Sequence, residues 1–469
     1  MINSSTIEAE TGTVRLSSGN VELDTILGGG FPVNSINILM GEPGSGKTVL
    51  AEALVFANAG DDRPILYLTT LSEPLEKVVR YLQGFDFFDE TKLSGAVIYD
   101  SIGADVAEQG VAAVVPRLKA AILAHRPKII VIDSFKAIHD LSTSVAEMRR
   151  MLFEMAGLLT AFETTAFLIG EYNSEQVATH PEFAVADSML EITRRKTGIR
   201  DERYIRVLKL RGSHYLEGQH AFEITRAGLT VYPRLVSPGR PPAYSMMGER
   251  VTTGVPGLDD MLRGGLPRGR STFVVGPTGS GKTTIALQFA LEGVRLKQKT
   301  LYVSFEENPT QLDAQIAALG SDPEEARRSG FLEFIYVSPV ELRIDSIITR
   351  MFQIIQAHSI RRIVVDAVGD LVVAADDLQR MHSYLYALMQ HFAVKGVTSI
   401  LTFEATAAMT ELDAKMSAVS DNIINLAMHP GEHPRRSLRI VKARGVGHDL
   451  ATRDFFVEAA GGRVGPAAS

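Results

Sequence analysis

Two short glycine-rich segments contain the residues of this chain whose types and spacing best suit chemistry. The first reads GEPGSGKT from Gly41 to Thr48, and the second reads GPTGSGKT from Gly276 to Thr283. In the pattern G-x-x-x-x-G-K-[ST], the glycines let backbone N–H groups face phosphate oxygens, the lysine reaches the β- and γ-phosphates, and the hydroxyl ligates Mg²⁺. Each segment follows a strand-like run and precedes a helical pattern. Both are therefore predicted to bind a nucleoside triphosphate with Mg²⁺.

The predicted phosphate contacts come from these two segments and the residue after the second one. They are Gly41, Gly44, Ser45, Gly46, Lys47 and Thr48 in the first, and Gly276, Thr278, Gly279, Ser280, Gly281, Lys282, Thr283 and Thr284 in the second. These residue types do not distinguish ATP from GTP.

An acidic residue ends a buried, strand-like run further along each half of the chain. Asp133 ends KIIVID and Asp366 ends RIVVD. A carboxylate at this point of a parallel sheet reaches the metal ion that accompanies the phosphates. We therefore predict Thr48 with Asp133, and Thr283 with Asp366, as the Mg²⁺ ligands.

Hydrolysis needs a further carboxylate that positions or activates water, and the two halves differ in this respect. The segment LYVSFEENP places Glu306 and Glu307 after the strand that follows the second phosphate loop, whereas ILYLTTLSEP places Leu71 and Ser72 at the corresponding point. Glu73 comes one position later, where side-chain alternation directs it elsewhere. Although a solvated strand end is the alternative for the glutamate pair, we expect the second half to hydrolyse ATP and the first mainly to hold it.

A lysine and an arginine two positions apart recur near the end of each half. Lys209 and Arg211 lie in KLRG, and Lys442 and Arg444 lie in KARG. On a strand such a pair shares one face, and this strand is far along the sheet from the phosphate loop of its own half. We expect the pairs to contact a neighbouring subunit's triphosphate, with Lys442 and Arg444 joining Lys282 in catalysis. A solvated edge strand is the alternative. Sites shared in this head-to-tail way require a closed ring.

The motifs repeat at a nearly constant offset, which indicates a tandem duplication. Lys47 and Lys282 are 235 positions apart, whereas Asp133 and Asp366, like the two K-x-R-G segments, are 233 apart. A period this long is a domain pair rather than a solenoid. The expected domains are residues 13–232 and 249–460, joined by a proline-rich linker at 233–248.

Each half alternates short apolar runs with helical patterns, so the expected fold class is α/β, twice. The expected buried strands are 36–40, 65–68, 128–133 and 165–169 in the first half, and 271–275, 301–305, 362–366 and 398–403 in the second. Continuous apolar runs of this length suit a mainly parallel sheet flanked by helices. The alternating segments 204–210 and 437–443 are expected to extend each sheet in antiparallel fashion.

Composition removes several functional classes. The 469-residue chain has no cysteine, which excludes disulfides, thiolate metal sites and cysteine nucleophiles. Its net charge of −7, its lack of tryptophan and its acidic or neutral candidate pore loops argue against nucleic-acid binding. No signal peptide or membrane span is indicated, so a cytoplasmic protein is expected.

Together these motifs resemble the KaiC family of RecA-type ATPases, over roughly residues 13–460. The two S/T-G-x-x-x-L-D-x-x-L-x-G-G openings, the phosphate loops, the glutamate pair, the strands ending in aspartate and the K-x-R-G closings carry the resemblance. It implies two tandem RecA-like P-loop domains and ATP as the nucleotide. It also implies a homo-hexameric double ring with ATP at subunit interfaces, whose first domain drives assembly and whose second phosphorylates its own serine or threonine across an interface.

The chain departs from that family in three places. Leu71 and Ser72 replace paired glutamates, which weakens the case for hydrolysis in the first domain. The segment KMSAVSDNII has Ser417 at the family's phosphorylated serine but Ala418 at the adjacent threonine, which leaves Ser417 as a single candidate phosphorylation site. The chain stops at Ser469, without the longer tail that contacts a KaiA partner, so regulation by a KaiA-like protein is not expected.

Three functions remain open from the sequence. The leading one is an ATP-driven signalling ring with ATPase activity and serine autokinase activity on Ser417, read by a KaiB-like protein or a histidine kinase. The second is a nucleic-acid motor or recombinase of the same fold, because fold does not fix function. The third is a nucleotide-sensing scaffold without catalysis.

Overall fold

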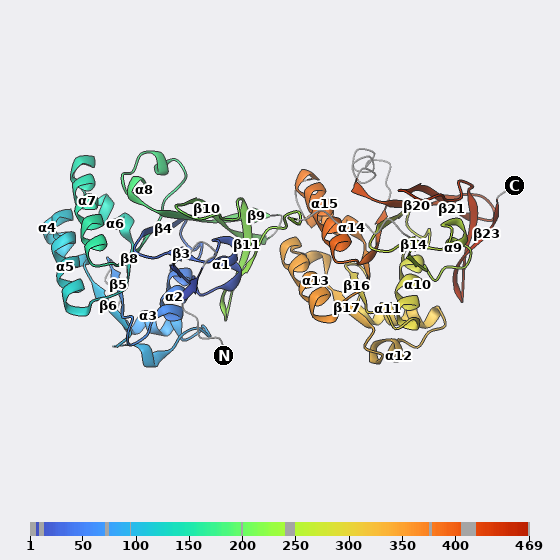
Figure 1. The fold of residues 1–469 in the computed structure, drawn as a ribbon, viewed down its shortest axis with the longest axis horizontal. Coiled ribbons are helices and arrows are strands. Elements are labelled where there is room, and N and C mark those ends of the chain that lie inside the picture. The colour runs from blue at the N-terminus through green and yellow to red at the C-terminus, as the bar shows by residue number, and fades with distance from the viewer. Residues whose placement is uncertain are drawn as a thin grey trace. The chain divides into compact units, whose positions relative to one another are not determined.

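The computed structural model describes residues 6–8, 14–70, 75–93, 95–197, 200–239, 249–374, 378–404 and 419–467. The chain divides into two compact units, Met1–Arg234 and Leu235–Ser469 (Figure 1). The predicted linker at 233–248 spans this division, and its residues 240–248 lie outside the described residues.

The first unit is built on a nine-stranded sheet whose strand order is β12-β11-β10-β9-β4-β8-β7-β5-β6. The six strands from β9 to β6 in that order run parallel to one another, and β10, β11 and β12 extend the sheet in antiparallel fashion. The bounds are β4 (Ile36–Gly41), β5 (Ile65–Thr69), β6 (Val97–Ser101), β7 (Ile129–Asp133), β8 (Thr165–Gly170), β9 (Ser188–Thr197), β10 (Arg200–Leu210), β11 (Gln219–Thr225) and β12 (Gly228–Tyr232).

Helices cover both faces of this sheet (Figure 1). They are α1 (Val21–Ile26), α2 (Lys47–Asn58), α3 (Leu75–Leu82), α4 (Gly103–Gln109), α5 (Val114–His125), α6 (Phe135–Asp140), α7 (Val145–Ala161) and α8 (Glu182–Val185), with 3₁₀ turns η1 (Glu90–Lys92), η2 (Gly110–Ala113) and η3 (Gln176–Ala178). A small sheet of β1 (Thr6–Glu8), β2 (Val14–Leu16) and β3 (Phe31–Pro32) completes the unit.

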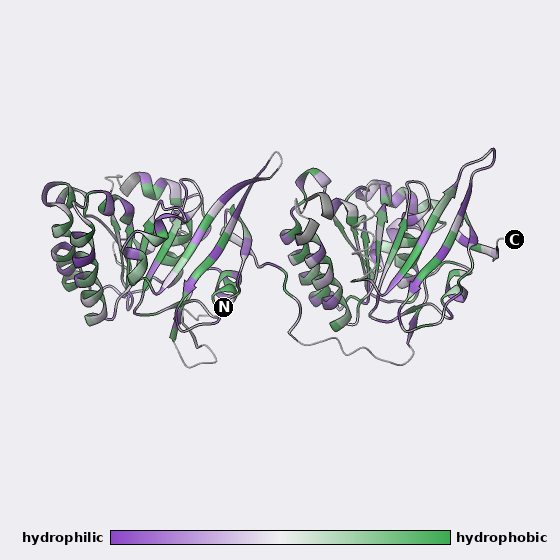
Figure 2. Cartoon of the chain, turned by 90° about the horizontal axis from the view of Figure 1, so that it is seen from above, coloured by the Kyte–Doolittle hydropathy of each residue, from purple (hydrophilic) through white to green (hydrophobic). Residues whose placement is uncertain are grey.

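The central strand shows why two layers of helices are needed. Leu39 on β4 packs in one hydrophobic cluster with Leu50 of α2, whereas its neighbours Ile38 and Met40 pack in another with the helices α5 and α7. Successive side chains of a strand point to opposite faces, so a strand with apolar residues on both faces must be covered on both sides. Figure 2 shows hydrophobic residues along the central strands of each unit.

The second unit repeats the same topology, in the order β17-β16-β18-β19-β15-β20-β21-β22-β23. Its strands are β13 (Arg250–Val251) and β14 (Leu266–Pro267) in a small sheet, and β15 (Ser271–Gly276), β16 (Thr300–Ser304), β17 (Leu332–Tyr336), β18 (Arg362–Asp366), β19 (Thr398–Glu404), β20 (Asn422–His429), β21 (Arg435–Ala443), β22 (Arg453–Glu458) and β23 (Gly461–Ala467) in the large one.

Helices again flank the large sheet. They are α9 (Leu258–Met261), α10 (Lys282–Arg295), α11 (Pro309–Ala318), α12 (Pro323–Arg328), α13 (Ile344–His358), α14 (Val368–Ala374) and α15 (Leu378–Val394), with the 3₁₀ turn η4 (Pro339–Glu341). The predicted class, two α/β halves with mainly parallel sheets flanked by helices, is confirmed. In the described part of the chain, none of the helices has the length and apolar character needed to span a bilayer.

Candidate functional site

The first phosphate loop lies at the carboxyl end of the central strand of its sheet. β4 ends at Gly41 and α2 begins at Lys47, with Gly46 as the N-cap at a φ of 113°. A Cβ atom on Gly41, whose φ is 154°, would lie 1.9 Å from the carbonyl oxygen of Ile192. Glycine is therefore required where the loop leaves the sheet. In open α/β sheets, ligands bind beyond the carboxyl ends of the strands.

The side chain of Lys47 folds back across this loop. Its Nζ donates hydrogen bonds to the carbonyl oxygens of Gly41 (3.0 Å) and Glu42 (2.8 Å). Burial lowers the pKa of Lys47, an effect that nearby carboxylates oppose. The hydroxyl of Ser45 is buried without a hydrogen-bond partner, and a Cβ on Gly44 would meet open space. An ammonium group, an unpartnered hydroxyl and a helix N-terminus together fit the loop to a phosphate group.

The two predicted Mg²⁺ ligands of the first unit are in contact. Asp133 ends β7, and its Oδ2 accepts a hydrogen bond of 3.0 Å from the hydroxyl of Thr48 and another of 3.0 Å from the phenol of Tyr67. Burial raises the pKa of Asp133, whereas these hydrogen bonds and the charge of Lys47 lower it. A hydroxyl and a carboxylate beside a phosphate loop are hard oxygen ligands of the kind that Mg²⁺ prefers.

The second loop has the same construction. β15 ends at Gly276 and α10 begins at Lys282, whose Nζ donates 3.0 Å hydrogen bonds to the carbonyl oxygens of Gly276 and Pro277. The hydroxyl of Ser280 is again buried without a partner. Thr283 and Thr284 follow Lys282 in the first turn of α10.

The second metal position is arranged differently around its aspartate. Asp366 ends β18 and accepts hydrogen bonds from the phenol of Tyr302 (2.8 Å) and from the hydroxyl of Thr402. The neighbouring strand β19 ends in Glu404, whose Oε1 accepts a 2.5 Å hydrogen bond from the hydroxyl of Thr278 in the phosphate loop. A carboxylate of β19 is thus tied directly to the loop.

Four carboxylates gather on one side of the second phosphate loop. Burial raises the pKa of Glu306, and the charges of Asp370, Asp366 and Glu404 raise it further. Burial also lowers the pKa of Lys282, while the charges of Glu404, Asp366 and Glu306 oppose that change. A cation beside these carboxylates would favour their ionised forms. The second site is therefore suited to an ATP–Mg²⁺ complex with a water-activating carboxylate beside it.

The predicted glutamate pair lies in a tight turn at the end of β16. The hydroxyl of Ser304 donates to the carbonyl oxygen of Glu307 (2.8 Å) and accepts from the N–H of Glu307 (3.1 Å). Burial raises the pKa of Tyr302, and the charges of Asp366 and Glu307 add to that rise. Glu306 thus belongs to the group of carboxylates, and Glu307 lies near the tyrosine that holds Asp366. The corresponding Leu71 and Ser72 lie outside the described residues.

Strand register separates the lysine–arginine pairs from the phosphate loop of their own unit. Leu210, next to Lys209, pairs with Ser188 on β9, and Ser188 pairs with Asn37 near the start of β4. From Asn37 to the loop at Gly41, β4 rises about 13 Å at about 3.3 Å per residue. The second unit has the same arrangement, with Ala443 level with Asn422 and Thr272. The pairs therefore lie toward the end of the sheet opposite to the phosphate loops.

Each arginine of these pairs lies one residue beyond its strand, because β10 ends at Leu210 and β21 ends before Arg444. The Arg211 side chain is 61% exposed with Nη1 3.3 Å from Asp187 Oδ1. Arg444 is 53% exposed with Nη1 3.9 Å from Asp421 Oδ1. Both arginines are therefore accessible to a neighbouring molecule. Lys442 Nζ donates to the carbonyl oxygen of Ser420 at 2.7 Å.

Sequence reasoning missed several residues of these sites. The glutamates Glu171 and Glu404 directly follow or end buried runs, TAFLIG and TSILTF, and they are 233 positions apart. The tyrosines Tyr67 and Tyr302, which donate to the metal-site aspartates, are 235 apart. Extending the repeat comparison beyond the known motifs would have found all four. The predicted phosphorylation site, Ser417, lies outside the described residues.

Comparisons with known proteins agree with this geometry. A family model described as the KaiC ATPase matches residues 16–236 and 251–469. The circadian clock oscillator protein KaiC 1 of Synechocystis sp. is 25% identical over 455 residues, which cover 92% of this chain and 86% of that protein. The circadian clock oscillator protein KaiC of Picosynechococcus sp. is 24% identical over 461 residues, covering 94% and 88%.

A third relative is similar over nearly the whole chain. The circadian clock protein KaiC3 of Synechocystis sp. is 24% identical over 475 residues, covering 98% of this chain and 93% of that protein. The similarity spans both units and both phosphate loops. The predicted fold of two tandem RecA-like P-loop domains is therefore confirmed.

Proposed function

The chain belongs to the KaiC family of ATPases, and on that premise we propose that it works as a homo-hexameric ring that binds ATP with Mg²⁺ at both loops. The second loop hydrolyses ATP, and the first mainly holds it between subunits. One observation carries this proposal above all: Glu306, Asp366 and Glu404 lie near Lys282, and Asp370 lies near Glu306.

Binding at the second loop uses groups that are already positioned. The backbone N–H groups at the start of α10 and the ammonium of Lys282 hold the phosphates, which requires Lys282 to exchange its carbonyl partners for phosphate oxygens. Thr283 and Asp366 hold Mg²⁺, which neutralises charge that develops on the phosphates. Tyr302 and Thr402 fix the Asp366 carboxylate through their hydrogen bonds.

The glutamate pair supplies the proton acceptor for water. The water oxygen bonds to the γ-phosphorus while the bond from that phosphorus to the β-phosphate oxygen breaks, which gives ADP and phosphate. Glu306 or Glu307 accepts the proton that the water loses. Because burial and neighbouring charges raise the pKa of Glu306, its carboxylate is a stronger base than an exposed glutamate.

A neighbouring subunit completes the site in this proposal. Lys442 and Arg444 of that neighbour approach the γ-phosphate and stabilise charge in the transition state, as an arginine finger does in other phosphoryl-transfer enzymes. Their place at the opposite end of their own sheet supports action on another subunit. Lys209 and Arg211 take the same position toward a first-unit loop. A repeated head-to-tail contact of this kind closes into a ring.

Substitution of the glutamate pair tests the hydrolytic assignment. We expect Glu306→Gln and Glu307→Gln together to lower the turnover of ATP by about 100-fold or more, because the proton acceptor is lost. The rings should stay intact by light scattering, since ATP binding remains. Glu341→Gln, an exposed glutamate on η4, is the matched control and should keep full activity. Full ATPase activity in the double variant would show that another group accepts the proton and would overturn the assignment, whereas a wild-type ring that binds ATP without hydrolysing it would be the nucleotide-sensing scaffold.

The second loop can also use a serine as the acceptor. In this part of the proposal the Oγ of Ser417 attacks the γ-phosphorus in place of water while Glu306 or Glu307 accepts its hydroxyl proton. The bond to the β-phosphate oxygen breaks, and the products are phosphoserine and ADP. The resemblance of KMSAVSDNII to the family's phosphorylated segment supports Ser417 as the acceptor. The output would then be a phosphate-dependent surface read by a KaiB-like protein or a histidine kinase.

Peptide mapping by mass spectrometry tests the serine directly. After incubation with Mg²⁺ and ATP, we expect one phosphate per chain on Ser417, absent from Ser417→Ala and from the Glu306/Glu307 double variant. The nearby Ser420 provides the matched control, because Ser420→Ala removes a serine three positions away and should keep the modification. An unmodified chain that still consumes ATP would limit the function to an ATPase whose nucleotide state is the signal.

A further inference from the structure

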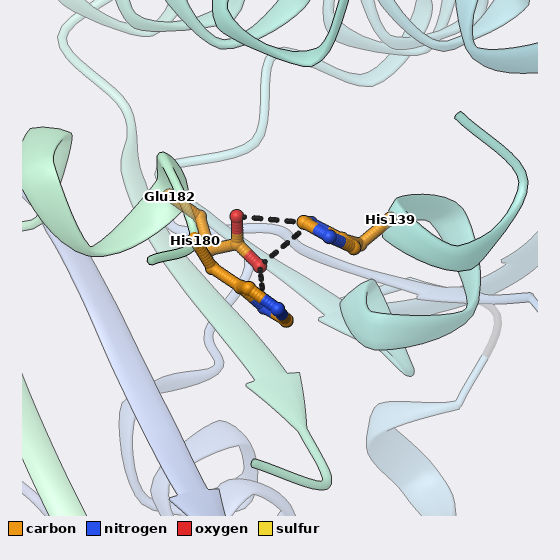
Figure 3. A group of neighbouring side chains, drawn as sticks. All are labelled: His139, His180 and Glu182. Carbon is orange, nitrogen blue, oxygen red and sulfur yellow. Dashed lines mark hydrogen bonds and ion pairs between the residues drawn. The ribbon is translucent and has the colours of Figure 1, made fainter. Parts of the chain in front are cut away.

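Two histidines and a glutamate converge in the first unit, in a group that the proposed ATPase chemistry does not use (Figure 3). His139 lies near the end of α6, which follows β7, and Glu182 begins α8, which lies in the connection from β8 to β9. His180 precedes Glu182 by two residues. The three ligand atoms, one from each side chain, lie within 4.8 Å of one another.

The carboxylate of this group is fully buried. The Glu182 side chain has no exposed surface, and the two histidine side chains are 18% and 17% exposed. Taking an ionised carboxylate out of water is costly unless it is paired or coordinates a metal ion. Nδ1 of His139 lies 3.1 Å from both carboxylate oxygens, which satisfies part of this requirement.

Three buried polar atoms around this carboxylate make no hydrogen bond of good geometry: Oε1 of Glu182, Nδ1 of His180 and the phenol oxygen of Tyr172. Oε1 of Glu182 lies 3.1 Å from Nδ1 of His139 and 3.6 Å from Nδ1 of His180. Buried polar atoms in native proteins nearly always have a partner, whether protein, water or ion. A ligand that binds both the Glu182 carboxylate and the His180 imidazole would satisfy two of these three atoms.

The spacing of these atoms fits a metal ion. Zinc bonds to imidazole nitrogen and carboxylate oxygen are about 2.0–2.2 Å long, so two ligand atoms at a tetrahedral angle lie roughly 3.3 Å apart. The separations of 3.1 Å and 3.6 Å from Glu182 to the two imidazoles bracket that value. Two imidazoles and one carboxylate form a set that zinc and its neighbours in the first transition row accept.

Aromatic side chains form a wall around the group. The ring of Tyr172 lies edge-on to His180 at 5.8 Å and to Phe183 at 5.0 Å, and the rings of His139 and His180 stack at 4.1 Å. Burial and the nearby Glu182 carboxylate raise the pKa of Tyr172, so its phenol stays protonated. Because a metal ion lies close to the plane of each imidazole that binds it, one of the two stacked histidine rings must turn when the ion binds.

An ion could reach the group from one side. A cavity of about 380 Å³ is lined by His180, Pro181 and Phe183, together with Arg149 and Leu152 of α7. Three protein ligands leave a fourth coordination position for water or another group.

We propose that His139, His180 and Glu182 bind one divalent transition-metal ion of the zinc class in the first domain. The ion fixes α6, which begins two residues after the metal-site aspartate Asp133, against α8. Val372 stands 233 positions after His139 at the corresponding place of the second half, so one ion per chain is expected. Its position is separate from the Mg²⁺ ligands Thr48 and Asp133.

Cobalt is a suitable probe because Co²⁺ in a four- or five-coordinate site with nitrogen ligands absorbs visible light far more strongly than hydrated Co²⁺. The full-length chain is stripped with a chelator and titrated with Co²⁺ in nucleotide-free buffer containing excess Mg²⁺. We expect visible bands that saturate at one equivalent per chain and are abolished by one equivalent of Zn²⁺.

Variants connect the spectrum to the three residues. His180→Ala and Glu182→Gln should lower the cobalt affinity by about 100-fold or more, since each removes a direct ligand. His433→Ala, an exposed histidine of the second domain, is the control and should bind as the wild type does. Unchanged cobalt bands in both ligand variants would overturn the assignment.

A measurement on the unmodified chain covers the case in which a ligand variant fails to fold. Wild-type protein is dialysed against equimolar ZnCl₂ with excess Mg²⁺, and its metal content is measured by mass spectrometry. One zinc per chain, with a higher unfolding temperature than the stripped protein, supports the proposal, because binding to the native state alone stabilises it. Retention of no zinc would show that the group is an ion-free hydrogen-bonded cluster.

Discussion

Glu52 on α2 shows how the surroundings of one side chain set its charge. Its Oε2 accepts a 2.7 Å hydrogen bond from the phenol of Tyr99 on β6, and both line a cavity of about 340 Å³ that also contacts Thr48 and Asp133. Burial raises the pKa of Glu52 to about 8, and the charge of Asp133 adds to that rise. At neutral pH the side chain is therefore mostly protonated. Leu287 stands 235 positions later, at the equivalent place of the second domain.

The buried carboxyl predicts a pH-dependent stability. Because the pKa of Glu52 is higher in the folded than in the unfolded protein, the protonated side chain contributes to the free energy of unfolding. This contribution is complete below about pH 4.5 and is lost as pH rises through about 8. Above that pH the folded state must hold a buried carboxylate. At pH 9, Glu52→Gln should therefore be more stable than the wild type by about 2–4 kcal/mol in the free energy of unfolding and should unfold at a higher temperature. At pH 5.5 the difference should be smaller.

Thermal unfolding of both proteins across this pH range checks the prediction. Glu154→Gln, an exposed glutamate on α7, is the matched control and should follow the wild type throughout. A difference between Glu52→Gln and the wild type that stays constant with pH would show that Glu52 is ionised in the folded protein.

At the residue scale, the sequence identified the members of each site that belong to a fixed local motif. The phosphate loops and the strand-ending aspartates could be predicted because their spacing along the chain implies their spacing in space. Glu404 and Tyr302 could not be recognised in this way, because a glutamate or tyrosine in a strand becomes part of a site only through the pairing of β15, β16, β18 and β19. The His139–His180–Glu182 group depends on tertiary structure in the same way.

A helix start fixes the position of the glutamate pair. Asn308 caps α11 directly after Glu307: its side chain accepts from the N–H of Gln311 at 3.0 Å, and the Gln311 side chain accepts from the N–H of Asn308 at 2.9 Å. Pro309 occupies the first helical position, where its missing N–H costs nothing. The reciprocal cap therefore holds the turn that contains Glu306 and Glu307.

Removal of this cap should affect stability and activity together. Asn308→Ala should lower stability by about 1 kcal/mol and reduce the turnover of ATP several-fold, because the turn before α11 gains freedom. Asn308→Asp keeps an acceptor for the Gln311 N–H and should recover most of both losses. If Asn308→Ala lost stability with normal turnover, the cap would stabilise the helix without positioning the glutamates.

At the element scale, prediction succeeded for strands with apolar residues on both faces and missed the edge strands, together with β9 and β20 inside the sheets. Runs such as Ile36–Gly41 are buried along their whole length and, apart from Asn37, apolar, which is the pattern of a strand inside a parallel sheet. The edge strand β6 reads VIYDS, and its polar end breaks any regular pattern of apolar residues that would indicate a strand. The outer strands β11, β12, β22 and β23 are held by hairpin pairing with β10 and β21 rather than by a continuous apolar run.

At the scale of the whole molecule, duplication produced two units with one topology and unequal sites. Both units keep a phosphate loop, a lysine and a strand-ending aspartate. In the described residues, the second loop has Glu306 and Asp370 beside it, whereas the charges near Lys47 come from Glu171, Asp133 and Glu42. This difference supports a division of labour in which one domain holds ATP for assembly and the other hydrolyses it.

The register of the strands makes the ring a requirement of the proposed chemistry. Lys442 and Arg444 lie level with the start of β15, at the end of the sheet away from the loop of their own domain. Within a single domain, the phosphate loop and the lysine–arginine pair therefore lie too far apart to contact the same triphosphate. The central claim is that a complete catalytic site forms only between neighbouring subunits.

Subunit mixing tests that claim most directly. Lys282→Ala and Arg444→Ala each inactivate a different part of the site, so homogeneous rings of either variant should lose nearly all ATPase activity. Dissociated subunits are mixed in equal amounts and then assembled with ATP and Mg²⁺. In a mixed ring, a quarter of the interfaces join an intact loop to an intact arginine, so about a quarter of the wild-type rate should return.

Two controls make the outcome decisive. Energy transfer between donor-labelled Lys282→Ala and acceptor-labelled Arg444→Ala subunits shows that the two variants assemble into the same rings, and Arg439→Ala, an exposed arginine on β21, should keep full activity on its own. Recovery of activity in the mixture of inactive variants is the result that the shared site predicts. A mixture as inactive as its components, in subunits shown to exchange, would mean that each chain completes its own site and would contradict the account.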